Sequence, residues 1–385
     1  MYRRFCLVNF TLESGRSSIL ILLSALLFSG EAVAQDSLAV DNNADKPSQF
    51  ILGVRQHYGF IIIHSRELRP FEDAYPRGTE LTLNWHLMER KSWEVCNCYP
   101  RVGLLFSFFD FDNRDILGYG FNVAGFVEPF FTSHKKLKIS LRPVAGLSLN
   151  TKPYDALTNP DNFSYSLPVN VYVQLSLALN YQMSKRLALT LAGNYNHVSN
   201  GGIKEPNKGV NFPTATLGLD YTFNPRAFEE RLKKKYEGSR KRRYDIAISS
   251  FVKRIFANSA YFGVFGIMGS ASQQIGRMSA LTLGAEWIWD GSLKWRMENQ
   301  LNIDKSYQRG AVLFGHEFLM GKFTFSQKIG VYFYDQTKYN DPVYQRYGIN
   351  YHLSDQIYTG VNLKAHRHVA DLIEIRLGWS FKGKG

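Results

Sequence analysis

The feature that most constrains the fold is an alternation of apolar and polar residues that continues along almost the whole chain. Between residues 187 and 196 the odd positions are mostly apolar or aromatic, and the even positions are small or polar (LALTLAGNYN). A period of two residues is that of a β-strand, whose successive side chains point to opposite faces. About sixteen segments, most of roughly ten residues or more, repeat this pattern, so the sequence predicts an all-β chain.

The second face of these segments decides between a soluble and a membrane protein. It carries Asn, Gln, Ser, Thr and charged residues, which the dry core of a soluble β-sandwich does not accept without partners. Short connections at 134–136 and 183–185 are interleaved with long ones at 65–76, 150–166 and 199–211. Short turns on one side and long loops on the other are typical of outer-membrane barrels. We therefore predict an antiparallel transmembrane β-barrel of about sixteen strands, with loop 199–211 outside; a soluble exported β-protein is the weaker alternative.

The N-terminus predicts export. Arg3 and Arg4 precede an apolar run, Ile19–Phe28, and Ala32-Val33-Ala34 then offers a small-residue cleavage site. This is the pattern of a secretory signal peptide, and the run is too short to span a membrane as a helix. The 22 Tyr and 28 Phe suit aromatic girdles at a membrane interface. We predict a signal peptide at 1–34 and a mature protein in the outer membrane of a Gram-negative bacterium.

A basic segment divides the mature chain. From Arg226 to Arg243 there are nine Lys or Arg against three Glu, and the strand pattern stops there. We predict residues 35–223 as one barrel half, 224–243 as a basic periplasmic connector and 244–385 as the second half. Residues 290–308, where a short alternation fades, are expected to be an outer loop.

The two halves resemble each other at one point. Leu179–Ser184 (LNYQMS) is similar to Ile349–Ser354 (INYHLS), and each leads through a strand to a histidine, His197 or His366. This is explained either by duplication of an eight-stranded unit or by recurrence of barrel-closing strands. Whether the strands close as one barrel or as two lobes also stays open.

Two cysteines remain once the signal peptide, with Cys6, is removed. Cys96 and Cys98 are separated by one residue, and an exported pair can be oxidised. A bridge across one residue would be strained, and two ligands make half a zinc site. We interpret the pair as a structural detail of a turn.

The candidate chemistry lies at the end of the alternating segment described first. His197 and Ser199 continue its apolar face, and Asn211 has the same parity on the next strand. A histidine can take the proton of a serine hydroxyl and so activate it as a nucleophile. On a membrane barrel this face meets lipid, so we expect the pair to open towards the outer leaflet.

The segment from His197-Val198-Ser199-Asn200 to Pro206-Asn207-Lys208-Gly209-Val210 resembles the active-site region of the PagL-like outer-membrane lipid A deacylases (acyloxyacyl hydrolases). The resemblance implies a serine hydrolase that acts on an acyl ester of lipid A from the outer face of a small barrel. It makes Ser199 the nucleophile and His197 the general base, and it places Asn200 and Asn207 near the oxyanion. It implies lipopolysaccharide of the outer leaflet as partner, with no metal, cofactor or nucleic acid.

The sequence departs from that family at Asn211, where the family has a Glu that orients the histidine. An amide can hydrogen-bond the imidazole but supplies no negative charge. The alternative is therefore a non-catalytic outer-membrane barrel, porin-like or a surface protein, with a decayed site. In the second half, which is similar to longer members of the family, His366 and His368 share a strand face but lack a third metal ligand, and Glu374 is a candidate partner of His366. We interpret these histidines as structural or interfacial.

Overall fold

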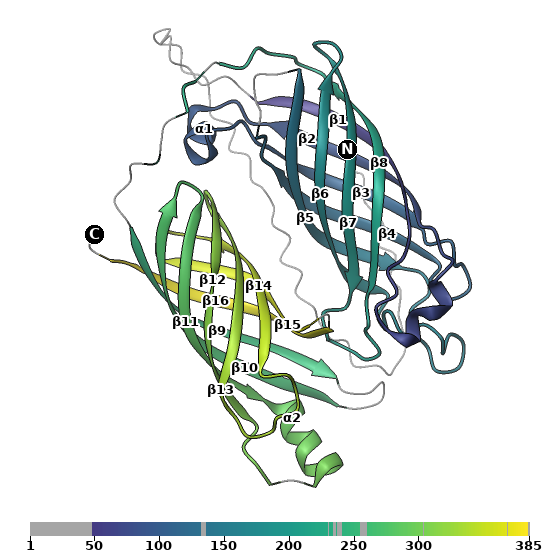
Figure 1. The fold of residues 1–385 in the computed structure, drawn as a ribbon, viewed down its shortest axis with the longest axis vertical. Coiled ribbons are helices and arrows are strands. Elements are labelled where there is room, and N and C mark those ends of the chain that lie inside the picture. The colour runs from purple at the N-terminus through teal and green to yellow at the C-terminus, as the bar shows by residue number, and fades with distance from the viewer. Residues whose placement is uncertain are drawn as a thin grey trace, which may run out of the picture. The chain divides into compact units, whose positions relative to one another are not determined.

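The computed structural model describes residues 48–131, 136–229, 231–233, 236, 241–254, 260–302, 304–367 and 369–383. In this part of the chain sixteen strands form two closed, antiparallel, eight-stranded barrels (Figure 1). The predicted all-β fold and strand number are confirmed, and of the two arrangements left open it is the two separate barrels that form. The signal peptide, most of the turn 134–136, much of the connector 224–243 and His368 lie outside the described residues.

The first barrel consists of β1 (Gln49–Gly59), β2 (Arg77–His86), β3 (Arg101–Asp110), β4 (Tyr119–Glu128), β5 (Leu137–Asn150), β6 (Val169–Gln182), β7 (Leu187–Ser199) and β8 (Val210–Thr222). Each strand pairs with its neighbours in sequence, and β8 returns to pair with β1. In this closing ladder Val54 lies opposite Leu219. Closure leaves no strand edge with unpaired backbone groups, which is what a lipid environment requires.

The second barrel repeats this plan with β9 (Arg242–Arg254), β10 (Tyr261–Gly276), β11 (Ser279–Asp290), β12 (Gln308–Met320), β13 (Phe323–Asp335), β14 (Val343–His352), β15 (Ile357–His366) and β16 (Val369–Lys382). Here β16 closes on β9, with Leu377 opposite Ile248. The likeness between the two halves of the sequence therefore corresponds to two units of the same topology.

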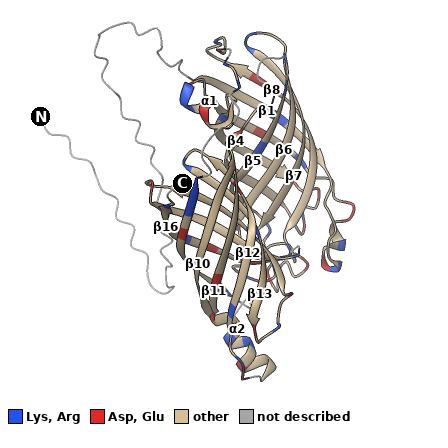
Figure 2. Ribbon diagram, turned by 60° about the vertical axis from the view of Figure 1, so that its left-hand side comes forward, with Lys and Arg blue, Asp and Glu red and all other residues tan. Residues whose placement is uncertain are grey.

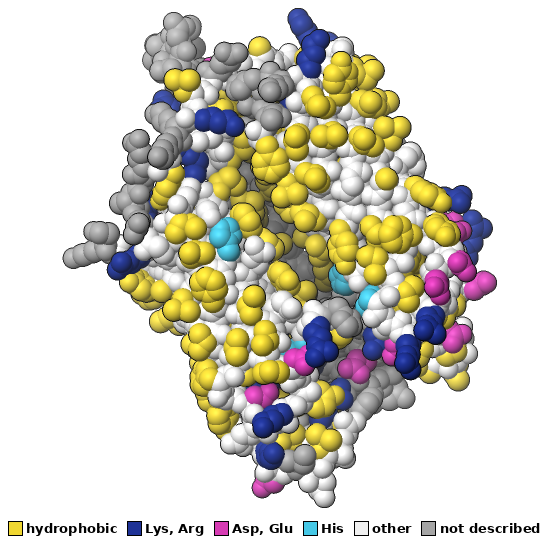
Figure 3. Space-filling view, in the orientation of Figure 1, with side chains coloured by type: hydrophobic (Ala, Val, Ile, Leu, Met, Phe, Trp, Pro, Cys, Tyr) yellow, Lys and Arg dark blue, Asp and Glu magenta, His cyan; other side chains and the backbone are white. Residues whose placement is uncertain are grey.

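The apolar face of each strand lies on the outside of its barrel. On β7 and β8, Leu191 is 52% exposed and Leu217 58%, whereas their sequence neighbours Thr190 and Thr216 are buried. The odd positions of these strands therefore face outward as predicted. Figure 3 shows hydrophobic side chains spread over the outer surface of both barrels, the surface that an outer-membrane barrel presents to lipid.

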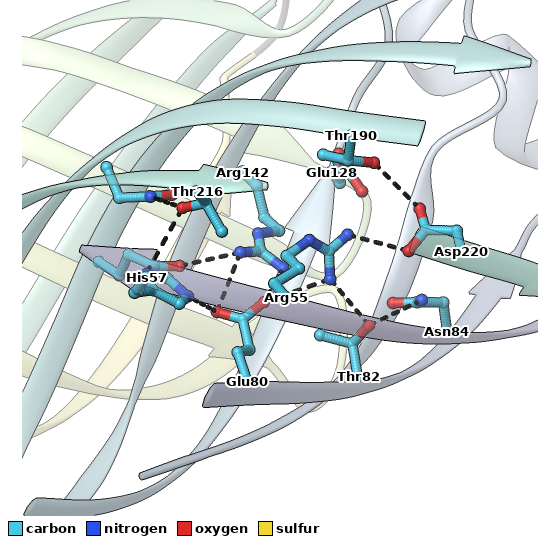
Figure 4. Close-up of polar contacts among 12 residues, drawn as sticks. Arg55, His57, Glu80, Thr82, Asn84, Glu128, Arg142, Thr190, Thr216 and Asp220 are labelled. Atoms are coloured by element: carbon cyan, nitrogen blue, oxygen red, sulfur yellow. Dashed lines mark hydrogen bonds and ion pairs between the residues drawn. The ribbon is translucent and has the colours of Figure 1, made fainter. Parts of the chain in front are cut away.

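Paired charges cross the interior of the first barrel (Figure 4). Glu80 accepts from Arg142 at 2.8 Å and from Arg55 at 3.2 Å. Asp220 in turn lies 3.3 Å from Arg55 and 2.8 Å from Arg101. All five side chains are at most 3% exposed. Buried ions are tolerated when each has partners of opposite charge, so this network ties five strands together across the lumen.

The second barrel holds a comparable network, and Figure 2 shows charged positions along the strands of both barrels. Arg346 pairs with Glu286 and with Glu374, and Arg376 also donates to Glu374. The expected pairing of Glu374 with His366 is therefore wrong. Glu374 lies opposite Asn362 in the β15–β16 ladder, four residues deeper than His366, whose ring nitrogen lies instead 3.8 Å from the Asp371 carboxylate.

The connections of the first barrel differ at its two rims. One rim carries loops 60–76, with the 3₁₀ helix η1 (Arg66–Phe71), 111–118, 151–168 and 200–209. The long loops predicted for one side therefore share one rim, and β6 and β7 are joined by a short turn at the other. The β2–β3 connection at that other rim is longer than a turn, because it contains α1 (Arg90–Cys96). Cys98 follows this helix and forms a disulfide with Cys96, so one intervening residue does not prevent the bridge.

The connection between β11 and β12, within the stretch 290–308 predicted as a loop, is partly helical where it is described. It contains α2 (Gly291–Arg296) and a π-helical turn, η2 (Met297–Leu301). Asp290 begins α2, because its carboxylate accepts from the backbone N–H groups of Ser292 and Leu293. None of the helices in the described residues is long and apolar enough to span a membrane.

Candidate active site

His197, Ser199 and Asn211 lie together where β7 and β8 reach the loop rim of the first barrel. His197 is opposite Asn211 in the β7–β8 ladder, and Ser199 is the last residue of β7. His197 Nε2 lies 2.9 Å from Ser199 Oγ, and His197 Nδ1 lies 2.6 Å from Asn211 Oδ1. Both ring nitrogens are therefore engaged, one by a hydroxyl and the other by an amide oxygen. This geometry suits a nucleophile, a base and a group that orients the base.

The outward face of β7 becomes covered as it approaches this group. Tyr195 is 47% exposed, whereas Ser199 is 4% and Asn211 9% exposed. Gly209 accounts for part of the cover: a Cβ on this residue would lie 2.8 Å from His197 Cε1 and 3.4 Å from Ser199 Cβ. The expectation that the serine opens directly to lipid is therefore not met, because the backbone of the β7–β8 loop packs over it.

Asn200 organises the loop that follows the serine. Its Oδ1 accepts from the backbone N–H groups of Gly202 and Ile203 at 3.1 Å, and its Nδ2 donates to the Lys204 carbonyl at 2.6 Å. Nδ2 also donates to Ser166 Oγ at 3.1 Å. These bonds close a tight turn, of the kind that Asn side chains often form. Both ends of this amide are thus occupied, by its own loop and by Ser166 of the neighbouring loop.

Asn207 is differently placed. Its Oδ1 accepts from the backbone N–H of Asn200 at 2.8 Å, which fixes it beside the residue that follows Ser199. Its Nδ2 is buried and has no hydrogen-bond partner among the described residues. A buried amide donor left without a partner is costly, and near a nucleophile it is a candidate donor to a developing oxyanion.

The neighbouring loop 151–168 holds this arrangement in place. Lys208 and Gly209 donate their backbone N–H groups to the carbonyls of Phe163 and Ser164, at 2.9 and 2.8 Å.

At the tip of loop 151–168, the Asp155 carboxylate accepts hydrogen bonds from the backbone N–H groups of Thr158 and Leu157. These bonds, that of Thr158 first, hold the pKa of Asp155 below its ordinary value.

A second histidine contacts the group. His64 follows β1, and its Nδ1 lies 3.3 Å from Asn211 Nδ2, while its Nε2 lies 3.0 Å from the Lys208 carbonyl oxygen. The sequence analysis missed this residue because it lies in a loop 133 positions before His197. No local pattern in the sequence points to it; its place near the site follows from the pairing of β1 with β8 in the closed barrel.

At the corresponding histidine of the second barrel, the described residues do not repeat this group. His366 packs against the rings of Tyr332 and Tyr344, and its Nε2 lies 3.4 Å from the Tyr332 hydroxyl. Arg367 and His368 follow it in the sequence, where Val198 and Ser199 follow His197. The catalytic candidates therefore belong to the first barrel.

Comparisons with known proteins match both barrels. A sequence profile described as lipid A 3-O-deacylase (PagL) matches residues 77–220, and one described as acyloxyacyl hydrolase, C-terminal domain, matches residues 242–383. No curated protein sequence matches the chain. Among solved structures, Neisserial surface protein A is 12% identical, with 45% of this chain and 97% of that protein aligned at a TM-score of 0.33. A mutant of the Rh. blastica porin is 10% identical, with 86% and 100% aligned at a TM-score of 0.21.

The two profiles fall one on each barrel, and the first spans the group around Ser199. The chain therefore belongs to the PagL family, in a form that has two barrels.

Proposed function

We propose that the chain is an outer-membrane serine esterase that removes an acyl chain from lipid A, with Ser199 as nucleophile and His197 as general base. The observation that carries this proposal is the continuous chain from Ser199 Oγ through the His197 ring to Asn211, with distances of 2.9 and 2.6 Å. It lies in the barrel that matches the lipid A 3-O-deacylase profile. The family and the lipid-compatible outer surface support a site in the outer membrane of a Gram-negative bacterium.

The chemistry follows from these contacts. Ser199 Oγ bonds to the ester carbonyl carbon while its proton passes to His197 Nε2. The carbonyl oxygen becomes an oxyanion, to which Asn207 Nδ2 is the candidate donor. Collapse of this intermediate breaks the ester bond, and the departing alkoxide takes the proton from Nε2. A water molecule then repeats both steps on the acyl-serine and releases the fatty acid.

In this scheme Asn211 orients the His197 ring but does not balance the positive charge that the ring gains when it takes the serine proton. Its Oδ1 accepts the Nδ1 proton of His197 and leaves Nε2 free to accept from the serine. When the imidazole becomes a cation, an amide stabilises it less than a carboxylate does. In a serine protease, replacing the orienting Asp by Asn lowers turnover by about 10⁴, so we expect slow hydrolysis here.

The second candidate is a barrel without catalytic activity, and Asn211 is the observation in its favour. Its porin-like form has less support, because the charges of the first barrel cross the lumen. Arg55, Glu80 and Arg142 are at most 2% exposed there. Above them, under the loop rim, lies a packed apolar cluster that includes Phe109 and Phe212. Side chains that fill a barrel in this way leave little room for a water-filled channel.

The division of the mature chain is also proposed: a catalytic half at 35–223, a basic connector at 224–243 on the periplasmic side, and a second half at 244–385. The catalytic loop then faces the cell exterior.

A Ser199→Ala protein should still insert and close both barrels, since Ser199 is not part of either lumen network.

Mass spectrometry of lipid A tests the function. Cells that express the protein should contain lipid A lighter by one acyl chain, and Ser199→Ala or His197→Ala should abolish this loss. Ser184→Ala, in the turn between β6 and β7, is the matched control and should behave as the unaltered protein. If lipid A is unchanged while the protein is verified in the outer membrane, the barrel is non-catalytic towards lipid A.

A further inference from the structure

His64 lies outside the residues that match either family profile, yet it is held firmly beside the catalytic group. The backbone N–H of Ile62 donates to the Asn211 carbonyl at 2.8 Å, which continues the β1–β8 ladder past the end of β1. Two residues later, His64 Nε2 lies 3.0 Å from the Lys208 carbonyl oxygen, and Nδ1 lies 3.3 Å from Asn211 Nδ2. The His64 ring thus connects Lys208, just before β8, with Asn211, near the start of β8.

The Lys208 carbonyl and a neutral His64 ring together set the direction of the hydrogen bonds in this series. A carbonyl oxygen only accepts, so His64 Nε2 must carry a hydrogen. In a neutral ring Nδ1 then has a lone pair, which accepts from Asn211 Nδ2. His64 Nδ1 also lies 3.2 Å from the Ile62 carbonyl oxygen, so two contacts compete at this nitrogen. The neutral ring with its hydrogen on Nε2 accepts from Asn211, whereas a protonated ring would instead donate to Ile62.

The amide of Asn211 is thereby fixed in one orientation. With Nδ2 directed at His64, Oδ1 faces His197 Nδ1 at 2.6 Å, and this nitrogen must carry the hydrogen. His197 Nε2 is then left with its lone pair, 2.9 Å from Ser199 Oγ. A neutral imidazole has one acceptor nitrogen, and only this tautomer places it at the serine.

We infer that His64 is a positioning residue, which holds the amide of Asn211 and through it selects the tautomer of His197 that can act as a base. The inference rests on the proposed function and extends it. A carboxylate at position 211 would need no such partner, because both of its oxygens accept. An amide has two unlike ends, and if it were reversed its N–H₂ would face His197 Nδ1 and move the ring hydrogen to Nε2.

A double-substitution experiment separates this role from a purely structural one. His64→Phe keeps a ring but removes both hydrogen bonds, and should lower kcat about tenfold, the rate equivalent of one lost hydrogen bond, with KM little changed. His64→Asn keeps an acceptor beside Asn211 and should retain most of kcat. Asn211→Asp supplies an acceptor that cannot be reversed, so in that background His64→Phe should change kcat by less than about twofold. An equal loss in both backgrounds would overturn the inference.

The tautomer itself gives a reading that does not depend on hydrolysis. Imidazole ¹⁵N chemical shifts of His197, measured in detergent micelles, distinguish a hydrogen on Nδ1 from one on Nε2. We expect Nδ1–H in the unaltered protein and a mixture, or Nε2–H, in His64→Phe. An unchanged Nδ1–H signal in His64→Phe refutes the role of His64 whether or not the protein is active. Loss of the proposed function alone would instead appear as unaltered lipid A with the expected tautomers.

Discussion

Gly209 offers a sharp test of the proposed catalytic geometry, because it contacts His197, the proposed general base, through its backbone alone. Its φ is +75°, a conformation that side-chain-bearing residues rarely adopt. A Cβ there would lie 2.8 Å from His197 Cε1, and ordinary contact begins at 3.4 Å. In Gly209→Ala the imidazole must therefore retreat by about 0.6 Å or the loop must shift by as much.

This displacement is large on the scale of catalysis. In the proposed mechanism the proton of Ser199 passes across 2.9 Å to His197 Nε2, and a misplacement of about 1 Å can cost 10² in rate. We expect Gly209→Ala to lower kcat by roughly 10- to 100-fold. Stability should fall by about 1–2 kcal/mol because of the left-handed backbone, which is too little to unfold a closed barrel.

The assay is release of fatty acid from purified lipid A by the protein in detergent, with folding verified by circular dichroism. Gly193→Ala is the matched control. Gly193 lies on β7, four residues before His197, and a Cβ at this position would meet no atom within 4 Å. This variant should keep full activity. A folded Gly209→Ala protein with kcat within twofold of the unaltered one would refute the proposed position of the base.

Three further outcomes follow from the structure. Asn207→Asp keeps the oxygen that accepts from Asn200 but removes the buried donor, and should lower kcat about 10²- to 10³-fold in the same assay, with the fold intact. Glu80→Gln leaves two buried guanidinium groups without their shared charge and should cost about 3–5 kcal/mol in urea unfolding; an unchanged midpoint would show that the network does not carry stability. Leu157→Cys, on the loop rim and 92% exposed, should react with an impermeant thiol reagent on intact cells, whereas Lys185→Cys at the other rim should react only after permeabilisation; the reverse pattern would invert the proposed orientation.

The faces of the strands could be predicted from the sequence because side-chain direction in a strand is a local property. The alternation around Leu191 is enough to decide which residues point outward, and the parity of His197, Ser199 and Asn211 follows from it. Closure is different. β8 can pair with β1 and close a small barrel, or pair with β9 and continue into a larger one. Both arrangements show the same two-residue period, so the sequence pattern does not distinguish them.

The same distinction explains the site. Ser199 and His197 are two residues apart, so their contact is implied by one strand, and Asn211 follows from the next. His64 enters only because the β1–β8 ladder continues through Ile62, which no local pattern reveals. The burial of Ser199 could not be predicted either, because it depends on the path of the loop backbone at Gly209, which the strand pattern does not specify.

Comparison of the two barrels separates what belongs to the scaffold from what belongs to the chemistry. Both lumens hold networks of paired Arg and Glu or Asp, around Glu80 in one and Glu286 in the other. The first barrel has the histidine, serine and amide at its rim, while His366, the corresponding histidine of the second, lies among tyrosines. Because the charge networks are present in both barrels, with and without the catalytic candidates, they do not account for catalysis. We therefore expect the networks to act on stability, by fixing the positions of the strands that carry the rim residues.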